Sequence, residues 1–166
     1  HGVQNVMSEN AQNAFNLFKA VEGKEEATGE WFEVTQEIVN QFADVTLDHQ
    51  FIHIDPERAK QTPFGGPIAH GFLTLSMLTH LGASANAENP DPKRHEGLMM
   101  GVNYGFEKVR FISPVKVGSR IRAHKLLSKV ELKGNAVQST QTMTVQIDGS
   151  DKPALVAEWL VRAVYA

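Results

Sequence analysis

Residues 70–81 form an apolar run that constrains the fold more than any other segment. The run reads HGFLTLSMLTHL, and drawn as a helix it is apolar on nearly every side. A helix that is apolar all round is buried, and about 12 helical residues span about 18 Å, enough to cross a small sheet. The sequence therefore predicts one buried helix over 70–81, ended by Gly82.

The chain after Gly97 changes to a period of two, which is typical of strands. Glycine and proline divide it into four predicted strands over 98–111, 119–132, 136–147 and 155–165. Strands joined by such short turns are antiparallel neighbours. A buried helix followed by these strands predicts an α+β hot-dog fold, in which an antiparallel sheet wraps around a central helix.

The N-terminal part is predicted to add a short helix over 13–21, a strand over 30–34 and a helix that Thr35 caps. A chain of 166 residues is long enough for one domain with its own core. We expect residues 7–166 to form that single domain and residues 1–6 to be an added leader in front of the native start.

Composition narrows the chemistry and the partners. The chain has no cysteine, which excludes disulfides, thiolate catalysis and cysteine-ligated metal sites. The formal net charge of −3 points to neither nucleic acid nor an acidic membrane surface as a partner. No apolar run is long enough to span a bilayer, and we expect a cytoplasmic location.

Residues 48–71 read DHQFIHIDPERAKQTPFGGPIAHG and hold the groups best suited to chemistry. Asp48 and His53 lie five residues apart, and a carboxylate and an imidazole that flank one water can move its protons. Gly71 begins the buried helix, where a backbone N–H is an unpaired donor in a positive local field and can stabilise an oxyanion. As a glycine it also lets a ligand approach the backbone closely.

The same segment resembles the two-part motif of the MaoC-like dehydratases and (R)-specific enoyl-CoA hydratases, a hot-dog-fold family. The first part of that motif, D-x-N-P-x-H-x-D-P, is matched by residues 48–56, DHQFIHIDP. The second part, P-I-x-H-G, is matched by residues 67–71, PIAHG. Gln50 and Phe51 replace the usual Asn and Pro, and this variant is similar to the nodulation-protein-N-like branch. The resemblance extends over residues 32–122.

The resemblance implies an (R)-specific enoyl-CoA hydratase or dehydratase, which reversibly adds water syn to a trans-2-enoyl thioester and gives a 3R-hydroxyacyl thioester. It implies Asp48 and His53 as the acid–base pair, without deciding which of them takes the water proton, and Gly71 as the oxyanion donor. No cofactor is expected beyond the coenzyme A or acyl carrier protein of the substrate. A homodimer is expected, with the active site near the interface and the polar loop 84–97 close by.

Five further residues are predicted to contact the substrate or to shape its site. His70 either fixes the helix start by a hydrogen bond or is a satisfied core histidine. Phe64 either lines the acyl channel or anchors its loop to the core, and the Thr79 hydroxyl either reaches the acid or bonds back to the helix. The five predicted substrate-binding residues are Gln50, Phe51, Phe64, His70 and Thr79.

A bound metal is not expected. A site made from His49, Asp48, His53 and Asp55 lacks the spacing that puts two histidines on one helix face with a glutamate base between them. Asp55 precedes a proline and is better suited to capping the next helix. Four basic residues either meet the phosphates of coenzyme A or are simply solvated: Arg110, Lys116, Arg120 and Arg122.

Three other readings compete with the hydratase. Asp48 and His53 are, taken singly, ordinary surface-loop residues, and only their place in the motif favours catalysis. A thioesterase of the same fold would use a carboxylate and water on the thioester carbon. A non-catalytic subunit would bind an acyl thioester without converting it. The two-part motif argues against the first reading, and the paired Asp48 and His53 argue against the other two.

Overall fold

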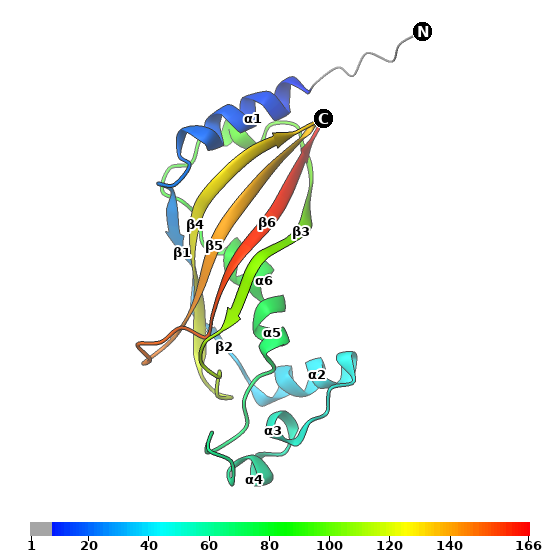
Figure 1. Cartoon of the computed structure of the whole chain (residues 1–166), viewed down its shortest axis with the longest axis vertical. Coiled ribbons are helices and arrows are strands. Elements are labelled where there is room, and N and C mark those ends of the chain that lie inside the picture. The colour runs from blue at the N-terminus through cyan, green and yellow to red at the C-terminus, as the bar shows by residue number, and fades with distance from the viewer. Residues whose placement is uncertain (1–7) are drawn as a thin grey trace.

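The computed structural model describes residues 8–166, so the leader predicted over residues 1–6 lies outside the described residues. One six-stranded antiparallel sheet curves around a central helix, as Figure 1 shows. The predicted α+β hot-dog fold is confirmed. Within residues 8–166 the helices are all too short or too polar to cross a membrane.

The sheet is built mainly from the four long strands that the alternating pattern predicts. Their observed ends agree with the prediction to within one residue. Strand β4 also carries the two short strands on its outer side, whereas β3 forms the opposite edge. In sheet order the strands are β1 (Glu26–Thr28), β4 (Arg120–Lys133), β5 (Ala136–Ile147), β6 (Leu155–Tyr165) and β3 (Leu98–Phe111), with β2 (Phe32–Glu33) also beside β4.

The helices begin where the sequence supplies a capping side chain. The Thr35 hydroxyl accepts from the Ile38 amide at 3.2 Å, and the Asp55 carboxylate accepts from the Arg58 amide at 3.2 Å. The predicted cap at Thr35 and the capping role of Asp55 are confirmed. The helices are α1 (Glu9–Ala20), α2 (Gln36–Thr46), α3 (Phe51–Ile54), α4 (Pro56–Ala59), α5 (Gly71–Ser76), α6 (Leu78–Ala83) and the 3₁₀ helix η1 (Pro92–His95).

The predicted central helix is present as α5 and α6, which follow one another with hydrogen bonding carried through Met77. The expectation that it is buried on all sides is wrong. The curved sheet covers one side only, where Leu73, Leu78 and Leu81 pack against it. Phe72, on another side, is 69% exposed. Hydrophobic pattern alone cannot distinguish a face covered by this chain from one left for a second chain.

The two ends of the sheet carry different helices. At one end α1 lies across the strands, where Ala11 and Ala14 pack with Val130 and Tyr165. At the other end α2, α3 and α4 gather below the start of α5 (Figure 1). The segment that holds the predicted catalytic residues is therefore at the α2–α4 end of the molecule.

Candidate active site

Asp48 lies just past the end of α2, on an exposed loop. The chain turns there because Leu47 adopts a left-handed conformation, with φ of 65°. Many helices end in this conformation, but the residue that adopts it is usually glycine or asparagine and seldom leucine. The Asp48 carboxylate accepts a hydrogen bond from the Gln50 amide at 3.3 Å. The local backbone therefore directs a carboxylate out of the loop while leaving most of its acceptor capacity free.

His53 lies in the one-turn helix α3 and is only 7% exposed. Its Nδ1 lies 2.7 Å from the Ile68 carbonyl oxygen. A carbonyl oxygen only accepts, so Nδ1 carries the hydrogen and Nε2 of the neutral ring is a free acceptor. Burial lowers the pKa of His53 below its usual 6.5, although the hydrogen bond to Ile68 and the charge of Asp48 act to raise it. The ring is thereby favoured in the form that can accept a proton.

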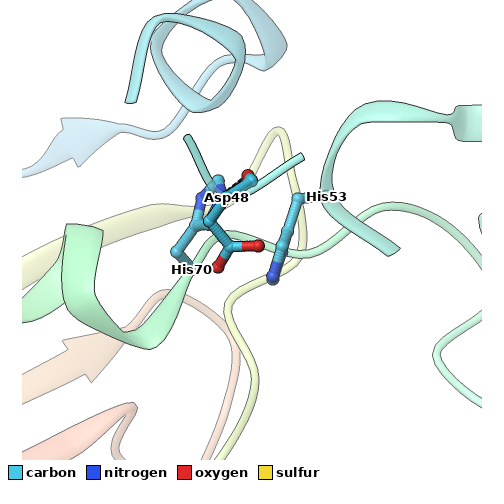
Figure 2. Close-up of side chains that lie close together, drawn as sticks. All are labelled: Asp48, His53 and His70. Atoms are coloured by element: carbon cyan, nitrogen blue, oxygen red, sulfur yellow. Dashed lines mark hydrogen bonds between the residues drawn. The ribbon is translucent and has the colours of Figure 1, made fainter. Parts of the chain in front are cut away.

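His70 brings the two predicted catalytic residues together. Its ring stacks on His53 with centroids 3.9 Å apart, and its Nε2 lies 3.0 Å from the Asp48 carbonyl oxygen. Figure 2 shows the Asp48 carboxylate and both imidazole rings gathered at one place. One polar side-chain atom from each of the three residues lies within 4.8 Å of the others. Residues 22 positions apart in the chain, Asp48 and His70, thus share one site.

A cleft of about 270 Å³ lies beside this group. His53, Gly71 and the buried Thr74 line it. The rest of the lining includes Phe111 at the end of β3, the segment 112–115 that follows it, and Ala154 before β6. His53 of the predicted pair therefore borders a space large enough for part of a substrate, and Asp48 lies next to His53.

Gly71 is the first residue of α5 and lines the cleft. None of the hydrogen bonds among residues 8–166 uses its amide, which is the expected state of a first-turn N–H. A side chain here would be crowded, because a Cβ built on Gly71 would lie 3.0 Å from the exposed Phe111 ring, which would have to shift slightly. The structure thus shows a free backbone donor beside the cleft and a steric reason for glycine at that position.

The other predicted substrate-binding residues lie apart from the cleft in this protomer. Gln50 is exposed, and Phe51 lies under the Arg58 guanidinium, whose carbon is 4.2 Å from the ring centre. Phe64 is half-buried in its turn and does not line the cleft. Thr79 is exposed on α6, on a side that the sheet does not cover.

One predicted role of His70 is to fix the start of the helix by a hydrogen bond, but its side-chain hydrogen bond goes elsewhere. Its side chain makes no capping hydrogen bond to α5, and its Nε2 points instead to Asp48. Sequence reasoning missed Thr74 and Phe111 as cleft residues. Thr74 lies three residues past Gly71 and faces the cleft, but a lone threonine in an apolar run carries no distinctive signal. Phe111 is brought there only by the sheet.

The three clustered groups do not suit a metal. The planes of His53 and His70 are inclined by only 24° and their centres are 3.9 Å apart. Ring nitrogens bind a metal in the plane of the ring at about 2.0–2.1 Å. Two nearly parallel rings cannot both direct a lone pair at one ion at that distance. The His70 Nε2 is also directed at a carbonyl oxygen, which makes it a donor.

A second cavity, of about 250 Å³, lies at the α1 end of the sheet and contains none of the predicted site residues. The partly buried ion pair Arg94–Glu25, with nitrogen–oxygen distances of 2.8 and 3.0 Å, lies in its wall. Lys125 also lines it and donates to the Gly82 carbonyl oxygen at the end of α6. That bond places a cation at a helix C-terminus, which stabilises the helix.

Comparison with known proteins gives three similarities. Residues 18–148 match the sequence profile described as MaoC like domain. The 3-hydroxyacyl-thioester dehydratase Z of Mycobacterium tuberculosis is 49% identical over 146 residues, which cover 87% of this chain and 92% of that protein. Nodulation protein N of Rhizobium meliloti is 46% identical over 145 residues, covering 86% of each.

A solved structure is similar in fold. The (R)-hydratase from A. caviae involved in PHA biosynthesis superposes with a TM-score of 0.64 at 23% sequence identity. The match covers 82% of this chain and 92% of that one. It shows that the curved sheet and central helix described here follow the same overall arrangement.

Proposed function

From the premise that the chain belongs to the MaoC-like dehydratase family, we propose that it is an (R)-specific enoyl-CoA hydratase or dehydratase. The family predicted from the two-part motif is confirmed, and it makes the protein a hydro-lyase that acts on acyl thioesters. One observation carries the finer proposal: the Asp48 carboxylate and the His53 ring lie together beside a cleft that also receives the Gly71 amide.

The reaction needs a proton acceptor close to the attacking water. In hydration, the water oxygen bonds to the β-carbon of the enoyl thioester while one of its protons leaves. The neutral His53 ring offers a bare Nε2, and Asp48 offers a carboxylate within 4.8 Å of a ring nitrogen. A water held between them can lose its proton to either group. The same proton then reaches the α-carbon, so that one water is added across the double bond.

The developing negative charge needs a donor. As the β-carbon is attacked, the electron pair of the double bond moves toward the thioester carbonyl oxygen, which becomes enolate-like. The free amide of Gly71 lies at the start of α5 on the cleft wall, and a preorganised N–H stabilises such an oxygen. Because water and proton come from one side of the site, the addition is syn. Dehydration follows the same steps in reverse.

We assign the remaining predicted contacts to this same reaction. Gln50, Phe51, Phe64 and Thr79 lie apart from the cleft of one protomer and stay predicted substrate contacts, and His70 contacts Asp48 and His53. Thr74 and Phe111 are added because they line the cleft. No cofactor takes part beyond the carrier of the acyl group, which is coenzyme A or an acyl carrier protein. The cytoplasmic location stays a prediction.

A homodimer completes the proposal. Strand β3 is a free sheet edge, and exposed edges with large apolar side chains invite pairing with another chain. Pairing of β3 with the same strand of a second copy would join the two sheets and cover these side chains. The exposed apolar residues on and beside this edge are Leu98, Met99, Met100, Val102, Tyr104, Phe106, Phe111, Ile112 and, on α5, Phe72.

The same dimer would place the active site near the interface. A twofold axis makes the two β3 strands antiparallel, so the start of one lies beside the end of the other. The cleft of one copy lies at the end of its β3, where Phe111 forms the wall. The loop 84–97 of the second copy precedes the start of β3 and would therefore approach that cleft.

Parallel assays of one preparation test the function. Hydration of crotonyl-CoA is monitored as a loss of the absorbance of the enoyl thioester. Thioester hydrolysis is monitored as release of free coenzyme A, and binding is measured with a saturated acyl-CoA. We expect hydration, with a product oxidised by a 3R-specific and not by a 3S-specific dehydrogenase. Release of coenzyme A without hydration would favour the thioesterase, and binding with neither reaction would favour the non-catalytic subunit.

A further inference from the structure

His70 is almost fully buried beside the catalytic pair. It is only 2% exposed, and its ring lies against Phe42, at 5.0 Å between centroids, as well as against His53. The preceding Ala69 amide donates to the Val115 carbonyl oxygen at 2.8 Å. The backbone bond at Ala69 and the two ring contacts therefore hold His70 in place, whereas Asp48 lies on an exposed loop.

One hydrogen bond connects His70 to the loop that carries Asp48. The His70 Nε2 lies 3.0 Å from the Asp48 carbonyl oxygen, so Nε2 carries the hydrogen and Nδ1 has a free lone pair. That Nδ1 is buried and has no partner among residues 8–166. A buried acceptor without a partner costs stability, and a core histidine chosen only for packing would not keep one. The ring orientation thus gives Asp48 a hydrogen-bond donor while leaving the Nδ1 of His70 without a partner among residues 8–166.

The loop has few other restraints at this point. The only other hydrogen bond that Asp48 makes among the described residues is from the Gln50 amide, at 3.3 Å and within the same loop. Leu47 just before it has the left-handed conformation of a helix end and is exposed. Among the described residues, the bond from His70 is the one hydrogen bond that joins Asp48 itself to a residue outside the loop, and the neighbouring His49 ring pairs with Asp44 of α2.

We propose that His70 is a positioning residue for the acid–base pair: its Nε2–H holds the Asp48 carbonyl at the place where its ring stacks on His53. The proposal rests on the proposed function, because it concerns how the pair meets one water. His70 itself does not touch the reacting atoms. It sets the distance between carboxylate and imidazole, on which the shared handling of a proton depends.

Two substitutions separate the hydrogen bond from the ring. In His70→Gln the side-chain amide nitrogen is as many bonds from Cα as Nε2 and can still donate to Asp48. In His70→Phe the stacking surface stays and the donor is lost. We expect His70→Phe to lower kcat by about 10- to 100-fold with KM within about twofold of wild type. His70→Gln should recover most of kcat. Equal losses in both variants, or a loss carried by KM, would overturn the proposal.

Two controls keep this test independent. Wild-type hydration of crotonyl-CoA is measured first, and its absence would overturn both the proposed function and this inference. If the wild type is active and the folded His70→Phe variant is equally active, only the inference is overturned. Nitrogen-15 NMR of the wild-type histidines needs neither a variant nor turnover. It should show His70 as the Nε2–H tautomer and His53 as the Nδ1–H tautomer. An Nδ1–H tautomer at His70 would refute the positioning bond even if His70→Phe fails to fold.

Discussion

At the scale of single residues, the Ile68 carbonyl sets the tautomer of His53 and so decides what that ring can do. Replacing the Asp48 carboxylate or the His53 imidazole should leave the fold intact. Asp48 is exposed, and glutamine at position 53 keeps a polar amide group in place of the imidazole. We expect Asp48→Asn and His53→Gln each to lower kcat/KM for crotonyl-CoA hydration by about 10²–10⁴-fold. The matched control is His49→Gln, an exposed neighbour whose Nε2 pairs with Asp44, and near-normal turnover in both test variants would contradict the assignment.

The lowered pKa of His53 also predicts how stability depends on pH. Burial, the main cause, lowers the pKa of His53 in the folded protein below 6.5, so between the two values the unfolded chain binds more protons. The free energy of unfolding should therefore fall as the pH drops below 6.5 and level off, for this group, below the folded pKa. Urea unfolding from pH 7.5 downward should show a steeper loss in wild type than in His53→Gln. Parallel curves would show that the folded pKa is not lowered.

At the scale of elements, the site depends on α5 and β3 meeting at Gly71 and Phe111. A methyl group at Gly71 would lie 3.0 Å from the Phe111 ring and inside the cleft. Alanine is also a better helix former than glycine by about 1 kcal/mol. We therefore expect Gly71→Ala to keep near-normal thermal stability while kcat/KM falls at least about tenfold.

The control for that substitution is Gly66→Ala. A Cβ at Gly66 meets nothing within 4 Å, so the variant should keep wild-type activity. Full activity in Gly71→Ala would show that neither the position of Phe111 nor close approach to the Gly71 amide matters to the reaction. A large loss of melting temperature would show that the contact is structural instead.

At the scale of the whole molecule, the single chain leaves an apolar strand edge and one side of its central helix uncovered. We expect light scattering at micromolar concentration to give twice the 18.3 kDa mass of the chain. Met100→Glu, at an exposed position near the start of that edge, should shift the mass toward one chain, because it buries an unpaired charge in the interface. A wild-type species of one chain mass would overturn the dimer.

The sequence by itself determined the elements and the chemistry of the site. Alternating patterns and turn residues marked the four long strands, because successive side chains of a strand point to opposite faces of the sheet. The two-part motif within residues 48–71 predicted Asp48, His53 and Gly71 as site residues, because their place in that motif, and not their spacing alone, favours catalysis. Local pattern and local spacing are properties that a sequence carries directly.

Only the tertiary structure decided how these parts meet. The Ile68 carbonyl that sets the His53 tautomer, the contact of His70 with Asp48, and the Phe111 wall all join residues distant in the chain. It also showed that Phe72 is exposed, where the sequence predicted a buried residue, and that Thr79, a predicted site residue, does not line the cleft of one protomer. Apolar pattern records that a face avoids water, but which surface covers it depends on how the sheet curves and on what the chain leaves for a second copy.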